Sequence, residues 1–224
     1  MEVQHHARIP RALVRREEHL VARCVGKRVL HLGCVDHPMH VERLQTGTWL
    51  HGRLTEVASE VVGLDIAEES VAAARELSGL DNMRVGDAEQ LPDQAAELGS
   101  FDVVVAGEII EHLNNPGLFL AGVRSVLNPG GLLLLTTVNA FCLRRLLRIP
   151  LGIESVHPDH VAYYSHATLR VLFERFGYEV VFAGSHRMDD PRHRTAYLVE
   201  RVATAISPNL GEGLVYDVRV GSAG

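Results

Sequence analysis

The sequence is poor in cysteine and contains no long apolar run. Its three cysteines are too few and too scattered for a disulfide framework, so we expect each one to serve packing in a reducing compartment. No stretch approaches the ~20 consecutive apolar residues that a transmembrane helix needs. The N-terminal stretch MEVQHHARIPRALVRREEHL carries charges but lacks the apolar core of a secretory signal. These absences predict a cytoplasmic protein with no membrane partner.

An excess of positive charge is missing as well. The chain has 28 acidic and 22 basic residues, a formal net charge of −6, and Lys27 as its only lysine. Proteins that bind nucleic acid over a large surface usually carry a basic face. We therefore expect a small-molecule substrate rather than nucleic acid. The sequence leaves open whether the chain is a monomer or a homodimer.

Linkers rich in proline, glycine or serine are absent, and so are repeats, so the 224 residues read as a single domain. Apolar strands alternate with helical stretches, and several strands are apolar on both faces. This pattern predicts an α/β fold, a doubly wound, seven-stranded, mostly parallel sheet with helices on both faces and an antiparallel edge. The predicted strands are Arg28 to Gly33, Val61 to Leu64, Met83 to Gly86, Phe101 to Ala106, Leu132 to Val138, Tyr178 to Ala183 and Leu214 to Val220.

Within this domain the sequence predicts three parts. Residues 1–27 form an N-terminal helical extension, with an amphipathic helix from Arg8 to Cys24. Residues 28–138 form a cofactor-binding half, and residues 139–224 form a substrate-side half that ends in a strand pair.

Small and acidic residues follow four of the predicted strands, and ligands of doubly wound sheets bind at the carboxyl ends of the strands. Gly33 follows the first strand, where a missing side chain lets a ligand approach the backbone. Asp65 ends the second strand, where an acid can accept hydrogen bonds from ribose hydroxyls. Asp87 follows the third strand and can accept from an adenine amino group.

Six segments resemble, in order and spacing, the motifs of class I S-adenosylmethionine-dependent methyltransferases. They are VLHLGC, VVGLDI, GDAEQLP, FDVVVAGEIIEHL, LNPGGLLLLTT and YYSHATLRVLFERFGYEV, and they span residues 29–181. The resemblance implies a Rossmann-like methyltransferase that binds S-adenosylmethionine. The cofactor-binding residues that we expect from it are His31, Gly33, Cys34, Asp36, Asp65, Ile66, Asp87, Ala88, Gly107 and Glu108.

The sequence departs from the family at the first motif, acid-x-Gly-x-Gly-x-Gly. His31 stands in the place of the acid, and Val35 and His37 replace two glycines. Two interpretations follow. Either the loop is remodelled, with Asp36 accepting the methionine ammonium group, or the fold is retained and binds another nucleoside or nucleotide without methylating. A dinucleotide-binding dehydrogenase is disfavoured, because G-x-G-x-x-G is absent after the first strand.

An unusually long segment separates Gly33 from Asp65. About thirty residues lie between them, against the ~20 usual between a glycine loop and its acidic residue. The additional stretch TGTWLHGRL contains the only tryptophan. We expect this stretch to reach the cofactor or to line its entrance.

The run Glu108-x-x-Glu111-His112 follows the fourth strand. It is similar to the E-x-x-E-H motif with which ubiquinone-pathway O-methyltransferases and small-RNA 3′-end 2′-O-methyltransferases hold a divalent cation. The RNA enzymes add a later histidine, which His160 matches. The resemblance implies Mg²⁺ or Mn²⁺ bound by Glu108, Glu111, His112 and His160, a chemically reasonable mixture of oxygen and nitrogen ligands.

The same residues also fit a site without metal. Glu111 and His112 then favour the start of a helix. His157 or His160 becomes the candidate general base, because imidazole titrates near neutral pH. The predicted catalytic set is accordingly His112, His157 and His160.

The sequence thus predicts methyl transfer to a small molecule, at an oxygen atom, in bacterial specialised or cofactor metabolism. The alternatives are the non-methylating nucleoside binder and an RNA 3′-end 2′-O-methyltransferase, which the acidic balance disfavours.

Overall fold

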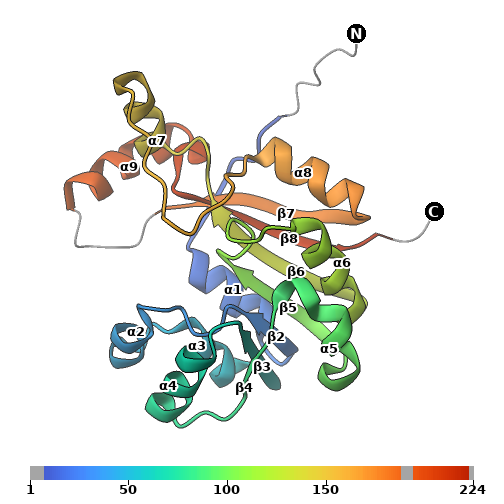
Figure 1. Cartoon of the computed structure of the whole chain (residues 1–224). Coiled ribbons are helices and arrows are strands. Elements are labelled where there is room, and N and C mark those ends of the chain that lie inside the picture. Colours follow the sequence, from blue (N-terminus) through green and yellow to red (C-terminus); the bar gives the residue numbers. More distant parts are fainter. Residues whose placement is uncertain (1–7, 188–193, 222–224) are drawn as a thin grey trace.

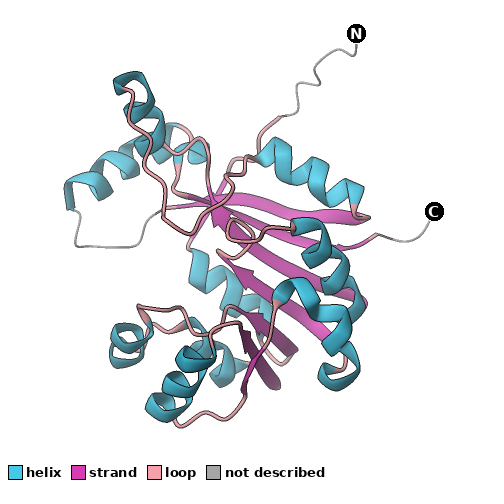
Figure 2. Cartoon of the chain, viewed as in Figure 1, coloured by secondary structure: helices cyan, strands magenta, loops and turns pink. Residues whose placement is uncertain are grey.

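The computed structural model describes residues 8–187 and 194–221. At its centre lies one sheet of eight strands in the order β1-β7-β8-β6-β5-β2-β3-β4, drawn in magenta in Figure 2. The strands are β1 (Ala12–Val14), β2 (Arg28–Leu32), β3 (Glu60–Asp65), β4 (Met83–Val85), β5 (Phe101–Gly107), β6 (Leu127–Val138), β7 (Tyr178–His186) and β8 (Gly213–Val220). Only β8 runs antiparallel to its neighbours. The predicted doubly wound α/β class is confirmed.

Helices cover both faces of the sheet (Figure 1). They are α1 (Arg16–Cys24), α2 (His40–Thr46), α3 (Leu50–Val57), α4 (Glu68–Ser78), α5 (Leu91–Leu98), α6 (Pro116–Val126), α7 (Leu143–Arg148), α8 (His166–Arg175) and α9 (Arg194–Ile206), with the short 3₁₀ helices η1 (Ala88–Gln90), η2 (Ile149–Leu151) and η4 (Pro208–Leu210). Within the described ranges, no helix is both long and apolar enough to cross a bilayer.

Alternation along the central strands determines which helices lie on which face. In β2, Leu30 and Leu32 pack in the main core with the buried sides of α5, α6 and α8, whereas Val29 packs in a second core with α1 and α3. A third cluster joins α4 to the turn after β2. Successive side chains of a strand point to opposite faces, so a strand that is apolar throughout must be covered on both sides.

Two features of the predicted sheet are wrong. The sheet has eight strands rather than seven, because Ala12–Val14 forms β1 and pairs with Gly184–His186 of β7. The antiparallel strand β8 lies between β6 and β7 rather than at the edge.

The predicted helix from Arg8 to Cys24 is likewise wrong in its first half, since α1 begins only at Arg16. The apolar stretch before it fills the otherwise open edge of β7. A helical pattern in the sequence cannot reveal such a long-range partner.

Buried ion pairs fix α1 to the sheet. The Asp217 carboxylate on β8 is fully buried, and it accepts a contact of 2.8 Å from His19 Nε2 and one of 3.0 Å from Arg23. The His19 ring also stacks on Phe182, with centroids 4.7 Å apart. These contacts place the start of α1, and therefore Arg16, at a defined position beside β5 and β6.

Candidate active site

The predicted cofactor residues meet along one edge of the sheet. Gly33, Asp65, Asp87 and Glu108 follow or end the strands β2, β3, β4 and β5, which are neighbours in the order β5-β2-β3-β4. Their carboxyl ends face the same side because these strands are parallel. The arrangement matches the ligand-binding edge of doubly wound sheets.

The turn after β2 begins with a left-handed glycine. Gly33 has φ 65°, and its N–H donates to the Leu64 carbonyl at 2.8 Å. A Cβ at Gly33 would lie 2.9 Å from Ile109 Cδ1, so the glycine also permits close packing against the segment after β5. The Val35 N–H donates to Asp65 Oδ2 at 3.1 Å, which ties this turn to the acid that ends β3.

The acids after β3 and β4 both hold turns. Asp65 Oδ1 accepts from the Ala67 N–H at 3.2 Å, and Asp87 caps η1 by accepting from the Glu89 N–H at 2.8 Å. Each carboxylate oxygen retains a second lone pair for a ligand. Beside Asp65, the Ile66 side chain is 70 % exposed and offers an apolar surface. Ala88 packs against the main core.

His31 occupies the acid position of the motif as a neutral side chain. Burial, and then the nearby His51 and Arg16, hold the pKa of His31 well below its usual range. Its Nδ1 lies 3.2 Å from His51 Nδ1, and His51 Nε2 lies 3.2 Å from Asn82 Oδ1. Asn82 donates its amide to the Val61 carbonyl, so its oxygen faces His51, which must carry a proton on Nε2.

This chain of contacts fixes the tautomer of His31. Because His51 Nε2 is the donor, its Nδ1 accepts, and His31 Nδ1 is therefore the protonated nitrogen. His31 Nε2 keeps a lone pair. The imidazole thus supplies a neutral acceptor at the position where the first motif of the resembling family has an acid.

Alternating charges surround the end of β5. Glu108, with φ 56°, lies 3.9 Å from Arg16 Nε and 3.8 Å from His186 Nε2. The adjacent Arg16 is the main cause that holds the pKa of Glu108 below its usual value; partial desolvation opposes this shift, and His186 adds to it. Asp36, with φ 64°, pairs with Arg43 at 2.6 Å, and burial raises the pKa of Asp36. Non-glycine residues in left-handed conformations cluster at functional sites, which makes this edge a candidate site.

Arg16 is the important residue that the sequence did not reveal. Its side chain is 14 % exposed, and its Nε donates to Thr136 Oγ1 at 3.1 Å. Its guanidinium lies against Gly107, where an added Cβ would be 2.8 Å from Nη2. No motif covers this position, since Arg16 reaches the site only through the packing of α1.

Three histidines gather beside this edge. The ring of His112 lies 4.5 Å from that of His160 and 6.0 Å from that of His157, measured between centroids. Burial and then the neighbouring His112 lower the pKa of His160 to about 4. The Nδ1 atom of His160 is buried and has no hydrogen-bond partner among the residues that the structure describes. This nitrogen is therefore free to bind a ligand.

Glu111 completes a cluster that suits a cation. Ligand atoms of Glu111, His112 and His160 all lie within 4.8 Å of one another. The buried Glu111 carboxylate accepts from Thr137 Oγ1 at 2.8 Å, and burial, followed by Glu108, raises its pKa to about 7. One carboxylate and two imidazoles form a mixed donor set that Mg²⁺ or Mn²⁺ can use.

Not all predicted site residues join this cluster. Glu108 faces Arg16 and His186 instead, although its charge still influences Glu111 and His160. His157 is more exposed than the others and accepts from the Asp159 N–H at 3.3 Å. The Cys34 side chain is fully buried, so Cys34 contributes only backbone atoms to the surface of the turn.

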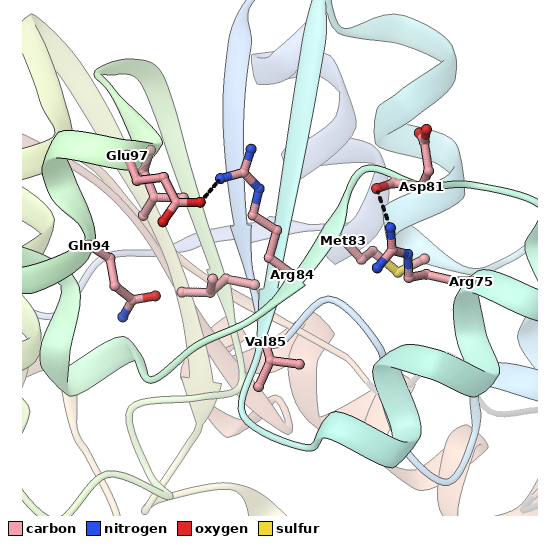
Figure 3. Close-up of a pocket in the computed structure, with 9 residues that line it drawn as sticks. Arg75, Asp81, Met83, Arg84, Val85, Gln94 and Glu97 are labelled. Carbon is pink, nitrogen blue, oxygen red and sulfur yellow. Dashed lines mark hydrogen bonds and ion pairs between the residues drawn. The ribbon is translucent and has the colours of Figure 1, made fainter.

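A separate cleft of about 490 Å³ lies at the other side of β4 (Figure 3). Arg84 and Glu97 pair across it at 2.9 Å, while Arg75 donates to the Asp81 carbonyl. None of the predicted site residues lines this cleft.

Comparisons with known proteins identify a family for the chain. A family model described as a methyltransferase domain matches residues 4–182. A probable S-adenosylmethionine-dependent methyltransferase of Mycolicibacterium smegmatis is 32 % identical over 196 residues, covering 85 % of this chain and 69 % of that protein. A ubiquinone biosynthesis O-methyltransferase of Roseobacter denitrificans is 36 % identical over 118 residues, 51 % of this chain and 42 % of that protein. This chain thus aligns with about two fifths of the ubiquinone enzyme's length.

Solved structures share the fold. An S-adenosylmethionine-dependent methyltransferase from Mesorhizobium loti superposes with a TM-score of 0.58 at 18 % identity, covering 92 % of this chain and 98 % of that one. At such low identity the likeness concerns the arrangement of strands and helices alone.

Proposed function

We propose that this chain, which belongs to the methyltransferase-domain family and depends on S-adenosylmethionine, methylates an oxygen atom of a small acceptor molecule. The observation that carries the proposal is the set of opposite charges near Gly33. It consists of Arg16 with Glu108, and Asp36 with Arg43. A methionine moiety bears an ammonium and a carboxylate, and the site offers both acceptors and a guanidinium for them. Asp65 and Asp87 end or follow the next two strands in the sheet order, β3 and β4, and are the proposed acceptors for the ribose and the adenine.

Arg16 is the proposed partner of the methionine carboxylate. It is mostly buried, and Thr136 accepts from only one of its five N–H groups. The ammonium group would be accepted by Asp36, by Glu108 or by the lone pair on His31 Nε2. Asp36 is already paired with Arg43 at 2.6 Å, which favours the other two acceptors.

Binding of S-adenosylhomocysteine tests this arrangement by calorimetry. A charge-assisted hydrogen bond contributes roughly 1.5–3 kcal/mol, so Arg16→Gln should weaken binding about ten- to hundredfold. Arg15→Gln is the matched control, because Arg15 forms an exposed ion pair with Glu18 and its side chain is 73 % exposed. Equal affinity in the wild-type protein and Arg16→Gln would remove Arg16 from the site.

Methylation of an oxygen atom also requires loss of the acceptor's proton. We propose that Glu111, His112 and His160 hold a divalent cation, which when bound polarises the acceptor hydroxyl. The orphaned Nδ1 of His160 and the mixed donor set support this assignment. Glu108 is then an acceptor for the cofactor rather than a metal ligand.

Mn²⁺ binding can be measured by electron paramagnetic resonance. This measurement distinguishes a histidine that binds the metal from one that acts as a general base. His160→Gln should abolish binding, whereas His157→Gln should leave it intact, because His157 is not among the clustered ligands. If the wild-type protein binds no Mn²⁺ and His157→Gln stops methyl transfer, His157 is instead the general base.

The RNA-end alternative uses the same proposed ligands, so the cation does not distinguish it from a small-molecule enzyme. The net charge of −6 favours a small acceptor. Transfer of a labelled methyl group to bacterial small-molecule extracts, but not to short RNA, is the expected result. Binding of the cofactor without transfer to any acceptor would support the non-methylating alternative.

A further inference from the structure

The turn that follows β2 lacks two of the three glycines found in related proteins, yet its path is tightly fixed. Asp36, not residue 35 or 37, takes the left-handed conformation with φ 64°. Val35 and Cys34 are both fully buried, so their side chains anchor the turn in the third apolar cluster. Because the turn lacks those glycines, other contacts must stabilise its backbone conformation.

The indole of Trp49 supplies one such contact. Its Nε1 donates to the carbonyl of Cys34 at 3.0 Å and to the carbonyl of Val35 at 3.2 Å. Trp49 is only 2 % exposed, so this bifurcated hydrogen bond is shielded from water. A buried donor that satisfies two carbonyls of one turn restricts that turn strongly. Trp49 lies in the third apolar cluster together with Cys34 and Val35 of the turn.

The chain between the turn and Trp49 closes back on itself. Asp36 pairs with Arg43, and the Met39 N–H donates to the Asp36 carbonyl at 2.9 Å. The Arg43 carbonyl in turn accepts from the Trp49 N–H at 3.1 Å. Both ends of the segment are thus fastened to the turn.

His51 supports the strand that enters the turn. It is fully buried, holds the tautomer of His31, and tilts against Trp49 with ring centroids 5.2 Å apart. Gly63 on β3 makes room for this packing, since a Cβ there would lie 2.7 Å from His51 Cε1 and 2.8 Å from Cys34 Sγ. β2, the turn after it and α3 are therefore connected by direct side-chain contacts.

We propose that residues 36–51 form a brace that replaces the missing glycines, with Trp49 as the positioning residue that shapes the cofactor turn. The proposal rests on the proposed function, because it assumes that S-adenosylmethionine binds at this turn. Through the Val35 N–H and Asp65, the brace also reaches the acid assigned to the ribose. A substitution that removes the Trp49 hydrogen bonds should therefore lower the affinity for the whole cofactor, although Trp49 acts only through the turn.

Trp49→Phe tests the brace, because phenylalanine keeps an aromatic ring but lacks the N–H donor. The dissociation constant for S-adenosylhomocysteine should rise about tenfold, and KM for S-adenosylmethionine should rise with little change in kcat. Leu54→Val is the matched control on α3, because Leu54 is fully buried in the separate core under α1. It should lower Tm while leaving the dissociation constant within twofold.

Amide hydrogen exchange gives a readout that needs no ligand. Trp49→Phe should accelerate exchange at Gly33 and Val35, whereas Leu54→Val should not. The brace is wrong if Trp49→Phe leaves both exchange and affinity unchanged, or if Leu54→Val alters them equally. Faster exchange in Trp49→Phe, together with no binding of S-adenosylhomocysteine by the wild-type protein, would support the brace and overturn the proposed function.

Discussion

A glycine can be required for two separate reasons: its backbone adopts a left-handed conformation, or a neighbouring atom leaves no room for a Cβ. Gly33 and Gly47 both adopt left-handed backbone, with φ 65° and 68°. A Cβ at Gly47 meets nothing within 4 Å, whereas one at Gly33 meets Ile109 at 2.9 Å. Comparing the two positions therefore isolates the packing contribution of the cofactor turn.

We expect Gly47→Ala to lower stability by about 1 kcal/mol, the usual cost of a left-handed alanine. Gly33→Ala should cost clearly more, because Ile109 must also move, and it should weaken binding of S-adenosylhomocysteine. Chemical denaturation and calorimetry measure both effects. Equal losses of stability in the two variants would mean that the contact with Ile109 is easily relieved.

The residues that the sequence predicted best are those whose place follows from the backbone alone. Gly33, Asp65 and Asp87 follow strands that are apolar on both faces, so their position at the sheet edge was predictable. Arg16 was not assigned a role, and Trp49 was expected only to reach the cofactor or line its entrance, because each reaches the turn region through tertiary packing. Glu108 was predicted to belong with Glu111, but its left-handed backbone faces it towards Arg16.

At the scale of elements, α1 is held by charge as well as by apolar contact. Its His19 and Arg23 converge on Asp217, whose carboxylate is fully buried in β8. Removing Asp217 leaves His19 and the 44 % exposed Arg23, which water can reach, so the expected cost is the loss of hydrogen bonds to a charged group, roughly 1.5–3 kcal/mol. The same anchor positions Arg16 one turn earlier along the helix.

Asp217→Ala should therefore lower Tm by roughly 3–12 °C, since about 1 kcal/mol shifts Tm by about 2–4 °C in a domain of this size. It should also weaken cofactor binding through the loss of Arg16 positioning. Glu60→Gln serves as the control, because its pair with Arg28 is exposed and such pairs contribute at most ~1 kcal/mol. A fall in Tm of similar size in both variants would contradict a structural role for Asp217.

The same scale shows where prediction of elements from sequence ends. Each predicted strand is present, because a run of apolar residues between polar turns marks a buried strand by itself. The three-residue β1 was missed, since its only support is the edge of a strand 170 residues later in the chain. The short helices α2 and α3 were also missed, because they lie in the inserted segment that no motif describes.

Across the whole molecule, buried histidines link stability to pH. Burial lowers the pKa of His51 to about 4, and His31, His160 and His166 are shifted in the same direction. In the unfolded chain a histidine titrates near 6.5, so between these values the unfolded state binds more protons. The contribution of His51 is thus fully present above pH 6.5 and is lost as the pH falls towards 4.

We expect the free energy of unfolding to fall on acidification, with His51 accounting for about 3 kcal/mol at 1.36 kcal/mol per pKa unit. His51→Gln should be less stable than the wild-type protein at pH 7.5, yet its stability should decline less between pH 6.5 and 4.5. Glu111, whose raised pKa contributes with the opposite sign, is common to both proteins and cancels in the comparison. Denaturant titrations across this pH range measure the difference, with Leu54→Val as a destabilised control that keeps the wild-type slope. Parallel curves for His51→Gln and the wild-type protein would show that the buried histidine chain does not contribute to acid sensitivity.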